Sequence, residues 1–173
     1  LELFNYLSGF SKQKSYQKLL VSPSSMRKKF IFLIKREIKN AEEGKKAEII
    51  AKMNSLVDPE IINLLYLASD SGVKISLIVR GICCLYPQRK NLSENIKVIS
   101  IIGHFLEHSR IFWFCNNGDN EVFIGSADWM RRNLDRRIEA VTPIEDYELK
   151  SKIYSLLQTY IKDDYFSWIM KED

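Results

Sequence analysis

EIIAKMNSLVDPEIINLLYLASDSGVKISLIV, residues 48–79, has the pattern of a strand, a helix and a second strand. Residues 48–53 are apolar enough for a buried strand, and residues 74–79 are rich in β-branched side chains. Asp58, followed by proline, is a typical helix start, and Gly72 stands where a left-handed residue often ends a helix. This order predicts two parallel strands joined by a right-handed crossover.

The residues before this segment add one more strand and one more helix. Residues 18–21 (KLLV) are short and apolar, as expected for a strand, and Pro23 fits the first turn of a helix. Apolar side chains from Met26 to Ile38 recur at intervals of three and four residues, so one face of this helix should pack on a sheet. The helix is expected to end near Gly44.

The second half of the chain changes character. Further strands are expected at residues 96–102, 111–114, 122–124 and 138–141. The polar loop at residues 116–120 (NNGDN) predicts a hairpin, and an amphipathic pattern over residues 153–161 predicts a last helix. The pattern as a whole predicts an α/β fold with a mixed, mostly parallel sheet flanked by helices.

Composition indicates one compact domain. With 173 residues, of which 46% are hydrophobic, the chain should bury roughly two-thirds of its unfolded surface. It lacks an apolar run of the ~20 residues that a membrane span needs and a secretion signal, so a cytoplasmic location is expected. Because the first residue is Leu1 rather than Met, we interpret the chain as a fragment. The cysteines at 83, 84 and 115 are odd in number and lack CxxC spacing, which predicts neither disulfides nor a zinc site.

The net charge of +4 is small, but the basic residues are unevenly distributed. They cluster at residues 27–29, 45–46, 88–90 and 131–137. Such clusters fit anionic partners, nucleic acid included, and they also fit ordinary solvated helix faces.

A histidine and an arginine stand just before the strand expected at residues 111–114. Alternation along a strand would send His108 and Arg110 to the same side. A neutral imidazole can attack phosphorus or carry a proton, and a guanidinium can bind phosphate oxygens with two hydrogen bonds. The pair is therefore a candidate for phosphoryl transfer, although an isolated H-x-R also fits a structural histidine.

A second candidate feature is the segment GSADWMRRN at residues 125–133. A strand that leads into Gly-Ser and a short helix can form an anion-binding turn. The alternative is an ordinary strand-to-helix turn in which Asp128 caps the helix.

Together the two features resemble one half-site of the phospholipase D superfamily: H-x-[KR] before a strand, a hairpin, then G-S-x-[ND] and a charged segment with Glu. The resemblance implies that two such halves meet across a pseudo-twofold axis, with one histidine as nucleophile and the other as acid or base. The sequence contains one half. Cys115 stands where the superfamily often has Asp, so no acid or base role is assigned there.

More specifically, the chain resembles the C-terminal region of the polyphosphate kinase family nearly from end to end. The stretches that carry this resemblance are FNYLSGF (4–10), KMNSLVD (52–58), SGV (71–73), VRGIC (79–83), LEHSR (106–110), GSADWMRRNLDRRIE (125–139) and TP (142–143). The resemblance implies that residues 1–20 are the tail of a preceding catalytic domain or a linking segment. Residues 21–173 would be the C-terminal phospholipase D-like catalytic domain.

The family resemblance also implies site residues. Arg80 and His108 are expected to contact nucleotide, with His108 as the catalytic residue of this chain and Arg110 as a further ATP or phosphate ligand. His104 stands where a basic residue is expected, and we interpret it as a loop histidine. No metal ligand is expected in the chain, so Mg²⁺ would be held from outside it. Sequence position alone adds Lys52, Asn54, Arg131 and Arg137 as candidate tunnel or phosphate contacts.

The implied activity is reversible transfer of the terminal phosphoryl group of ATP to inorganic polyphosphate, through a phosphohistidine outside this chain. The isolated fragment is expected to be inactive. Expected partners are ATP or ADP, polyphosphate, the preceding catalytic domain and other copies of the full enzyme, but not nucleic acid. The expected location is cytoplasmic, with membrane association of the full complex left open.

Two alternatives remain. One is a phospholipase D-like phosphodiesterase or nuclease that pairs two identical chains, each supplying one His108. The other is a non-catalytic module that binds polyanions, whose binding should weaken steeply with salt.

Overall fold

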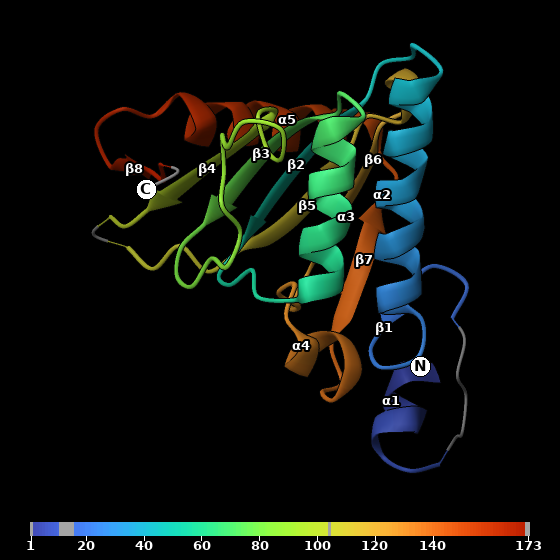
Figure 1. The fold of residues 1–173 in the computed structure, drawn as a ribbon. Helices are drawn as coiled ribbons and strands as arrows, with labels where there is room; N and C mark the ends of the chain where they lie inside the picture. The colour runs from blue at the N-terminus through green and yellow to red at the C-terminus, as the bar shows by residue number, and fades with distance from the viewer. Residues whose placement is uncertain (1, 11–15, 104, 172–173) are drawn as a thin grey trace.

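A computed structural model describes residues 2–10, 16–103 and 105–171 (Figure 1). These residues form an eight-stranded sheet with the order β1-β7-β6-β5-β2-β3-β4-β8. The strands are β1 (Leu20–Val21), β2 (Glu48–Met53), β3 (Lys74–Val79), β4 (Ile96–Ile101), β5 (Arg110–Phe114), β6 (Glu121–Gly125), β7 (Ala140–Ile144) and β8 (Ser167–Ile169). The helices are α1 (Glu2–Leu7), α2 (Met26–Glu42), α3 (Pro59–Asp70), α4 (Arg131–Asp135) and α5 (Tyr147–Lys162), with a short 3₁₀ turn η1 (Asn116–Gly118).

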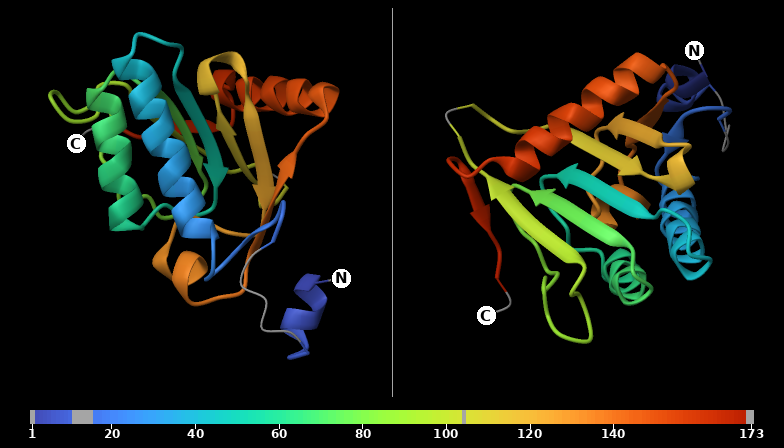
Figure 2. Two further views of the ribbon diagram at one scale, coloured as in Figure 1. Left: turned by 90° about the vertical axis from the view of Figure 1, so that its right-hand side faces the viewer. Right: turned by 90° about the horizontal axis from the view of Figure 1, so that it is seen from above.

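Helices cover both faces of the sheet. Helices α2 and α3 lie on one face and α5 crosses the other, as the two views in Figure 2 show. Each face has its own apolar cluster: Phe30, Leu65 and Phe112 belong to the cluster under α2 and α3, and Ile50 and Leu157 to the one under α5. Burial of these apolar side chains is the main stabilising contribution to the arrangement.

The ends of α3 follow the sequence prediction, whereas the start of α2 does not. The Asp58 carboxylate accepts a hydrogen bond of 3.1 Å from the Ile61 N–H, which caps α3. Gly72, just after α3, has a φ of +90°, in the left-handed region. Helix α2 begins at Met26 after Ser25, so Pro23 lies in the preceding turn and not in the first helical turn.

The prediction of a mostly parallel sheet is wrong, although the mixed α/β class is confirmed. Strand β3 pairs in parallel with β2 and with β4, and the other five pairings in the described sheet are antiparallel. For β5 and β6 the physical reason is the short connection between them. Parallel neighbours need a long crossover such as α3, but β5 and β6 are joined by the short turn at η1, which reverses the chain.

An ion-pair network fastens the helices at one end of the sheet. Arg27 on α2 bonds to Asp58 at 2.6 Å, to Glu60 at 2.9 Å and to Asp135 at 2.6 Å. Burial alone would raise the pKa of Asp58, but the hydrogen bonds from Arg27 lower it below its usual value. The network holds the starts of α2 and α3 close to the end of α4.

The close approach of β6 and β7 explains the glycine at position 125. A Cβ atom on Gly125 would lie 2.6 Å from Val141 Cγ2 and 2.7 Å from Val141 Cα, and would also meet the carbonyl oxygen of Ala140.

We expect Gly125→Ala to lower the free energy of unfolding by about 1–3 kcal/mol, because the backbones must move apart. Thermal unfolding followed by circular dichroism measures this. Gly103→Ala, with nothing within 4 Å of its added Cβ, is the matched control, and equal melting temperatures would contradict the argument.

Candidate functional site

The strand register brings the predicted site residues to one end of the sheet. Met53 of β2 pairs with Val79 of β3, so Asn54 and Arg80, the next residues, leave the sheet side by side. Strand β5 runs antiparallel to β2 and begins at the same end with Arg110. The prediction that His108 and Arg110 share a site with the segment after β6 agrees with this geometry.

His108, Arg110 and Asp128 form a connected row of side chains. Arg110 Nη1 lies 2.9 Å from His108 Nδ1 and donates a 2.8 Å hydrogen bond to the His108 carbonyl oxygen. The other side of the guanidinium faces Asp128, with Nε 3.1 Å from Oδ1 and Nη2 3.3 Å from Oδ2. His108 is exposed, whereas the Asp128 side chain is buried, so the row runs from the interior to the surface.

Asp128 is the main site residue that sequence reasoning missed. The sequence names Asp128 itself only as a possible helix cap, besides its place in the G-S-x-[ND] pattern, but α4 is preceded by Met130 and has no side-chain cap. Instead, Asp128 Oδ1 accepts a 2.8 Å hydrogen bond from the Asn54 N–H, in addition to its contacts with Arg110. Its place in the G-S-x-[ND] pattern was a usable signal, because that pattern puts a polar side chain next to the H-x-R segment.

Trp129, the next residue, anchors the segment after β6. Its ring is fully buried and lies 5.2 Å from the Phe112 ring and 5.6 Å from the Phe30 ring, between centroids. Its carbonyl oxygen accepts hydrogen bonds of 3.0 Å from the N–H groups of Val57 and Asp58. The loops after β2 and β6 are thereby fixed to each other, which places Asp128 beside Arg110.

Ser126 is exposed, but its hydroxyl is bonded to a buried carboxylate. Its hydroxyl donates a 2.5 Å hydrogen bond to Glu139, whose other oxygen accepts a 2.6 Å bond from Asn133. Arg137 Nε lies 3.4 Å from the same Glu139 oxygen, and the Arg137 side chain is 55% exposed. The Gly-Ser turn is therefore braced by a carboxylate, while Arg137 keeps part of its guanidinium at the surface.

The arginines predicted to bind phosphate differ in how many hydrogen bonds and ion pairs they already make within the protein. Arg80 is partly exposed, and its guanidinium makes no hydrogen bond or ion pair with any residue that the structure describes. Arg131 on α4 is exposed and likewise has no ion pair within the described ranges. Arg110 has most of its donors occupied by Asp128 and His108. Arg80 and Arg131 are thus the better placed of these cations for an incoming anion.

Lys52 and Asn54 are buried. The Lys52 side chain is 3% exposed, and its ammonium lies 3.1 Å from Glu107 and 2.9 Å from the Ser109 hydroxyl. Asn54 Oδ1 is a buried oxygen without a hydrogen-bond partner among the described residues. Whether Lys52 and Asn54 contact phosphate stays a prediction, and His104 lies outside the described residues.

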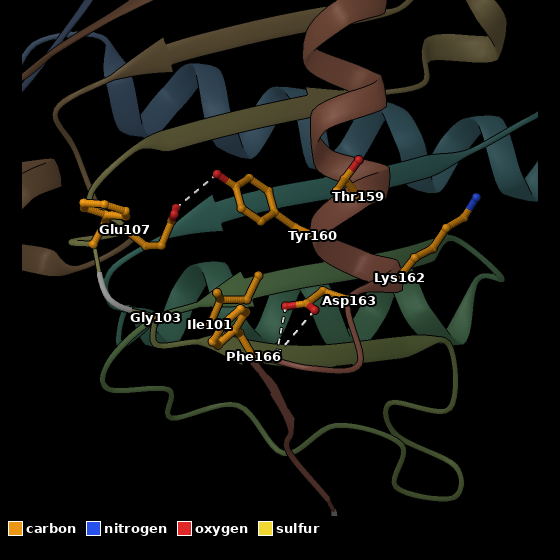
Figure 3. Close-up of a pocket in the computed structure, with 9 residues that line it drawn as sticks. Ile101, Gly103, Glu107, Thr159, Tyr160, Lys162, Asp163 and Phe166 are labelled. Atoms are coloured by element: carbon orange, nitrogen blue, oxygen red, sulfur yellow. Dashed lines mark hydrogen bonds between the residues drawn. The ribbon is translucent and has the colours of Figure 1, made fainter.

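A cavity of about 650 Å³ adjoins the His108 segment. Figure 3 shows that Glu107 and Tyr160, on opposite sides of it, are joined by a hydrogen bond. The Tyr160 hydroxyl donates this bond over 3.1 Å. Burial raises the pKa of Tyr160, and the Glu107 carboxylate raises it further, so the hydroxyl keeps its proton.

The carboxylates of the site do not suit a metal ion. Among the described residues there is no group of three or more His, Cys, Asp or Glu side chains that could hold one. Asp128, Glu139 and Glu107 are each engaged with a cationic side chain. Within the same ranges, none of the helices is long and apolar enough to cross a membrane.

Comparison with known proteins agrees with this geometry. Residues 19–173 match the family model described as polyphosphate kinase C-terminal domain 2. Curated relatives named polyphosphate kinase include one from Parasynechococcus marenigrum, 60% identical over 100% of this chain and 24% of its own length. Another, from Dictyostelium discoideum, is 51% identical over 99% of this chain and 16% of its own length. The chain therefore spans about a quarter of the bacterial relative.

Solved structures give the same result. A polyphosphate kinase from Porphyromonas gingivalis matches with a TM-score of 0.95 and 43% identity, over 99% of this chain and 26% of that one. Nuc from Salmonella typhimurium, a phospholipase D family member, matches with a TM-score of 0.62 and 15% identity, over 89% of this chain and 97% of that one, which is a likeness of fold alone. The fold is therefore phospholipase D-like, and because the family model covers nearly the whole chain, the protein belongs to the polyphosphate kinase C-terminal domain family.

Proposed function

We propose that this chain is the C-terminal catalytic part of a polyphosphate kinase, which transfers the terminal phosphoryl group of ATP reversibly to inorganic polyphosphate. In this proposal the phosphohistidine forms outside the chain. The observation that carries it is the row His108–Arg110–Asp128 at the end of the central strands, where Arg80, unpaired among the described residues, also leaves the sheet. An exposed imidazole held in place by Arg110, at the end of the sheet where a free guanidinium also emerges, suits phosphoryl transfer.

His108 would act on the oxygen that bridges the departing phosphoryl group. A guanidinium can only donate hydrogen bonds, and Arg110 Nη1 lies 2.9 Å from His108 Nδ1 and 3.3 Å from Nε2, so in this proposal the nearer nitrogen, Nδ1, accepts. This favours the neutral tautomer with its proton on Nε2, which can donate to an oxygen as negative charge develops. Asp128 would hold Arg110 in the orientation that this tautomer needs.

Arg80 and the exposed arginines near α4 would bind the anions. Arg80 follows β3 at the carboxyl end of a parallel strand, where open α/β sheets place ligands. Its guanidinium would contact nucleotide phosphates, and Arg131 and Arg137 would contact nucleotide or polyphosphate. Arg110 is assigned here mainly to orient His108.

Magnesium is part of the proposal only as a partner of the phosphates. The described carboxylates do not offer it a site, so its ligands would come from elsewhere, and no step is derived through it. A preceding catalytic domain, assembly into homo-oligomers and a cytoplasmic location, with or without membrane association, stay predictions.

The nucleotide part of the proposal is tested by Arg80→Ala in the full-length enzyme. Losing a charged hydrogen-bond partner of phosphate should raise KM for ATP on the order of 10-fold. Steady-state polyphosphate synthesis at varied ATP measures this. Arg89→Ala is the matched control, because Arg89 is exposed and lies in the loop fastened by Asn95 to Ser69, at the end of α3.

Unchanged kinetics in Arg80→Ala would contradict the assignment. A second outcome would identify the chain as a polyanion-binding module. In that case it binds polyphosphate with a steep salt dependence, and neither Arg80→Ala nor His108→Ala changes the turnover of the full-length enzyme.

A further inference from the structure

The segment that carries His108 has few attachments to the rest of the protein. Residues 105–109 lie between β4 and β5, and within the described ranges they make no backbone hydrogen bonds to other backbone groups. Phe105 is 88% exposed and Leu106 is 71% exposed, so apolar packing does not fix the segment either. Side-chain contacts must therefore determine where His108 lies.

Arg110 bonds to His108 itself, and further contacts come from the two residues next to His108. Lys52 Nζ lies 3.1 Å from Glu107 Oε2 and donates a 2.9 Å hydrogen bond to Ser109 Oγ. One buried ammonium thus holds the chain on both sides of His108. The Tyr160 hydroxyl donates a second hydrogen bond, of 3.1 Å, to the same Glu107 oxygen.

The burial of Lys52 shows that these contacts are needed. Its side chain is 3% exposed, and a charge removed from water to this degree is costly unless it is paired. Glu107 provides the opposite charge, and the Tyr160 ring lies 5.2 Å below the ammonium in a cation–π contact. Lys52 comes from β2 and Tyr160 from α5, so the group ties the segment to both the sheet and a helix.

The cavity beside the group supports the same interpretation. Glu107, Tyr160 and Phe105 line it, so the space next to the segment is not filled by core side chains. In Figure 3 the Glu107–Tyr160 hydrogen bond spans the distance between the segment and α5. Polar contacts, and not close packing, connect these two parts.

We propose that Lys52, Glu107 and Tyr160 form a positioning group that fixes the segment containing His108 for phosphoryl transfer. None of the three is assigned contact with the reacting atoms. The inference rests on the proposed function of His108, and it predicts that loosening the group lowers turnover without weakening nucleotide binding through Arg80.

The test uses two variants of the full-length enzyme, each with a matched control. Tyr160→Phe removes only the hydroxyl, and Tyr147→Phe, 83% exposed on the same helix, is its control. Lys52→Met removes the ammonium but keeps the apolar stem, and Lys74→Met, 70% exposed on β3, is its control. Glu107→Gln keeps an acceptor oxygen but removes the charge opposite Lys52, so it should lower kcat in the same direction as Lys52→Met.

Two readouts are needed. Hydrogen–deuterium exchange of the peptide that contains residues 105–111 should be faster in Tyr160→Phe and Lys52→Met than in their controls. The kcat for polyphosphate synthesis should fall about 5-fold in Tyr160→Phe, as for the loss of one hydrogen bond, and on the order of 10²-fold in Lys52→Met. KM for ATP should change less than about twofold, since a positioning effect acts on the reactive geometry.

Each contrary result has a definite meaning. Unchanged exchange, or faster exchange with unchanged kcat, overturns the positioning group, and so does an effect on KM alone. The exchange readout does not depend on activity, so it separates this inference from the proposed function. If His108→Ala retains full activity, the proposed function fails, whatever the exchange shows.

Discussion

Polyphosphate synthesis from ATP is expected to fall by roughly 10²–10⁴-fold when His108 is replaced by alanine in the full-length enzyme, the range for losing a general acid or base. The side chain is exposed, so its removal should leave folding intact. The neighbouring Arg110 keeps its pairing with Asp128, at 3.1 Å, and should stay in place. Synthesis is measured by incorporation of labelled phosphate, with circular dichroism and thermal unfolding to verify the fold.

The control for this prediction is His108→Gln. Glutamine can still accept a hydrogen bond from Arg110, but it cannot transfer a proton at neutral pH. If His108 acts as acid or base, the glutamine variant should be nearly as impaired as the alanine variant. If glutamine restores synthesis, His108 acts only as a hydrogen-bonding group. If both variants are fully active, His108 is a structural histidine and the proposed site is wrong.

The fold could be predicted from sequence wherever the signal was local. Helix α3 was predicted from Asp58 to Gly72 because its cap and its end depend on neighbouring residues alone. Strand β7 was expected at residues 138–141 but runs from Ala140 to Ile144, across Pro143. Pairing with β1 ends at Val141, so at Pro143 the strand has a neighbour on one side only, where a residue without an N–H is tolerated.

Other features of the fold depend on distant pairing. Strand β8 has three residues after a helix and exists because it pairs with β4 at the edge of the sheet. The antiparallel placement of β5 beside β2 likewise could not be derived from either strand alone. Both strands had apolar patterns compatible with either direction, which is why the sheet was expected to be mostly parallel.

The site could likewise be predicted only where its signal was local. The spacing of His108 and Arg110 implies one face, because alternation along a strand is a local rule. The partners of Lys52 could not be inferred this way: Glu107 and Tyr160 come from a loop and a helix far along the chain. Sequence position alone makes Lys52 a candidate phosphate contact, and only the structure shows its contacts with Glu107 and Ser109.

Asp128 should also matter for turnover, though less than His108, because it is buried and acts through Arg110. In Asp128→Asn the carboxylate charge is lost, while an oxygen remains to accept the 2.8 Å hydrogen bond from the Asn54 N–H. Arg110 loses its charged partner and becomes free to turn away from His108 Nδ1. We expect kcat to fall on the order of 10–10²-fold, as for the loss of an orienting charge in a preorganised site.

The more severe variant, Asp128→Ala, adds a stability effect, because it leaves Arg110 and the Asn54 N–H without their buried partner, at a cost of roughly 3–5 kcal/mol. Asp119→Asn, in the exposed loop between β5 and β6, is the control and should behave like the unmodified enzyme.

Double-mutant analysis then tests the row of His108, Arg110 and Asp128 itself. If Asp128 acts through Arg110 on His108, adding Asp128→Asn to His108→Ala should cost little further activity. If the two losses multiply instead, Asp128 acts on the reaction by a route that does not pass through His108, and the proposed role of the row is wrong.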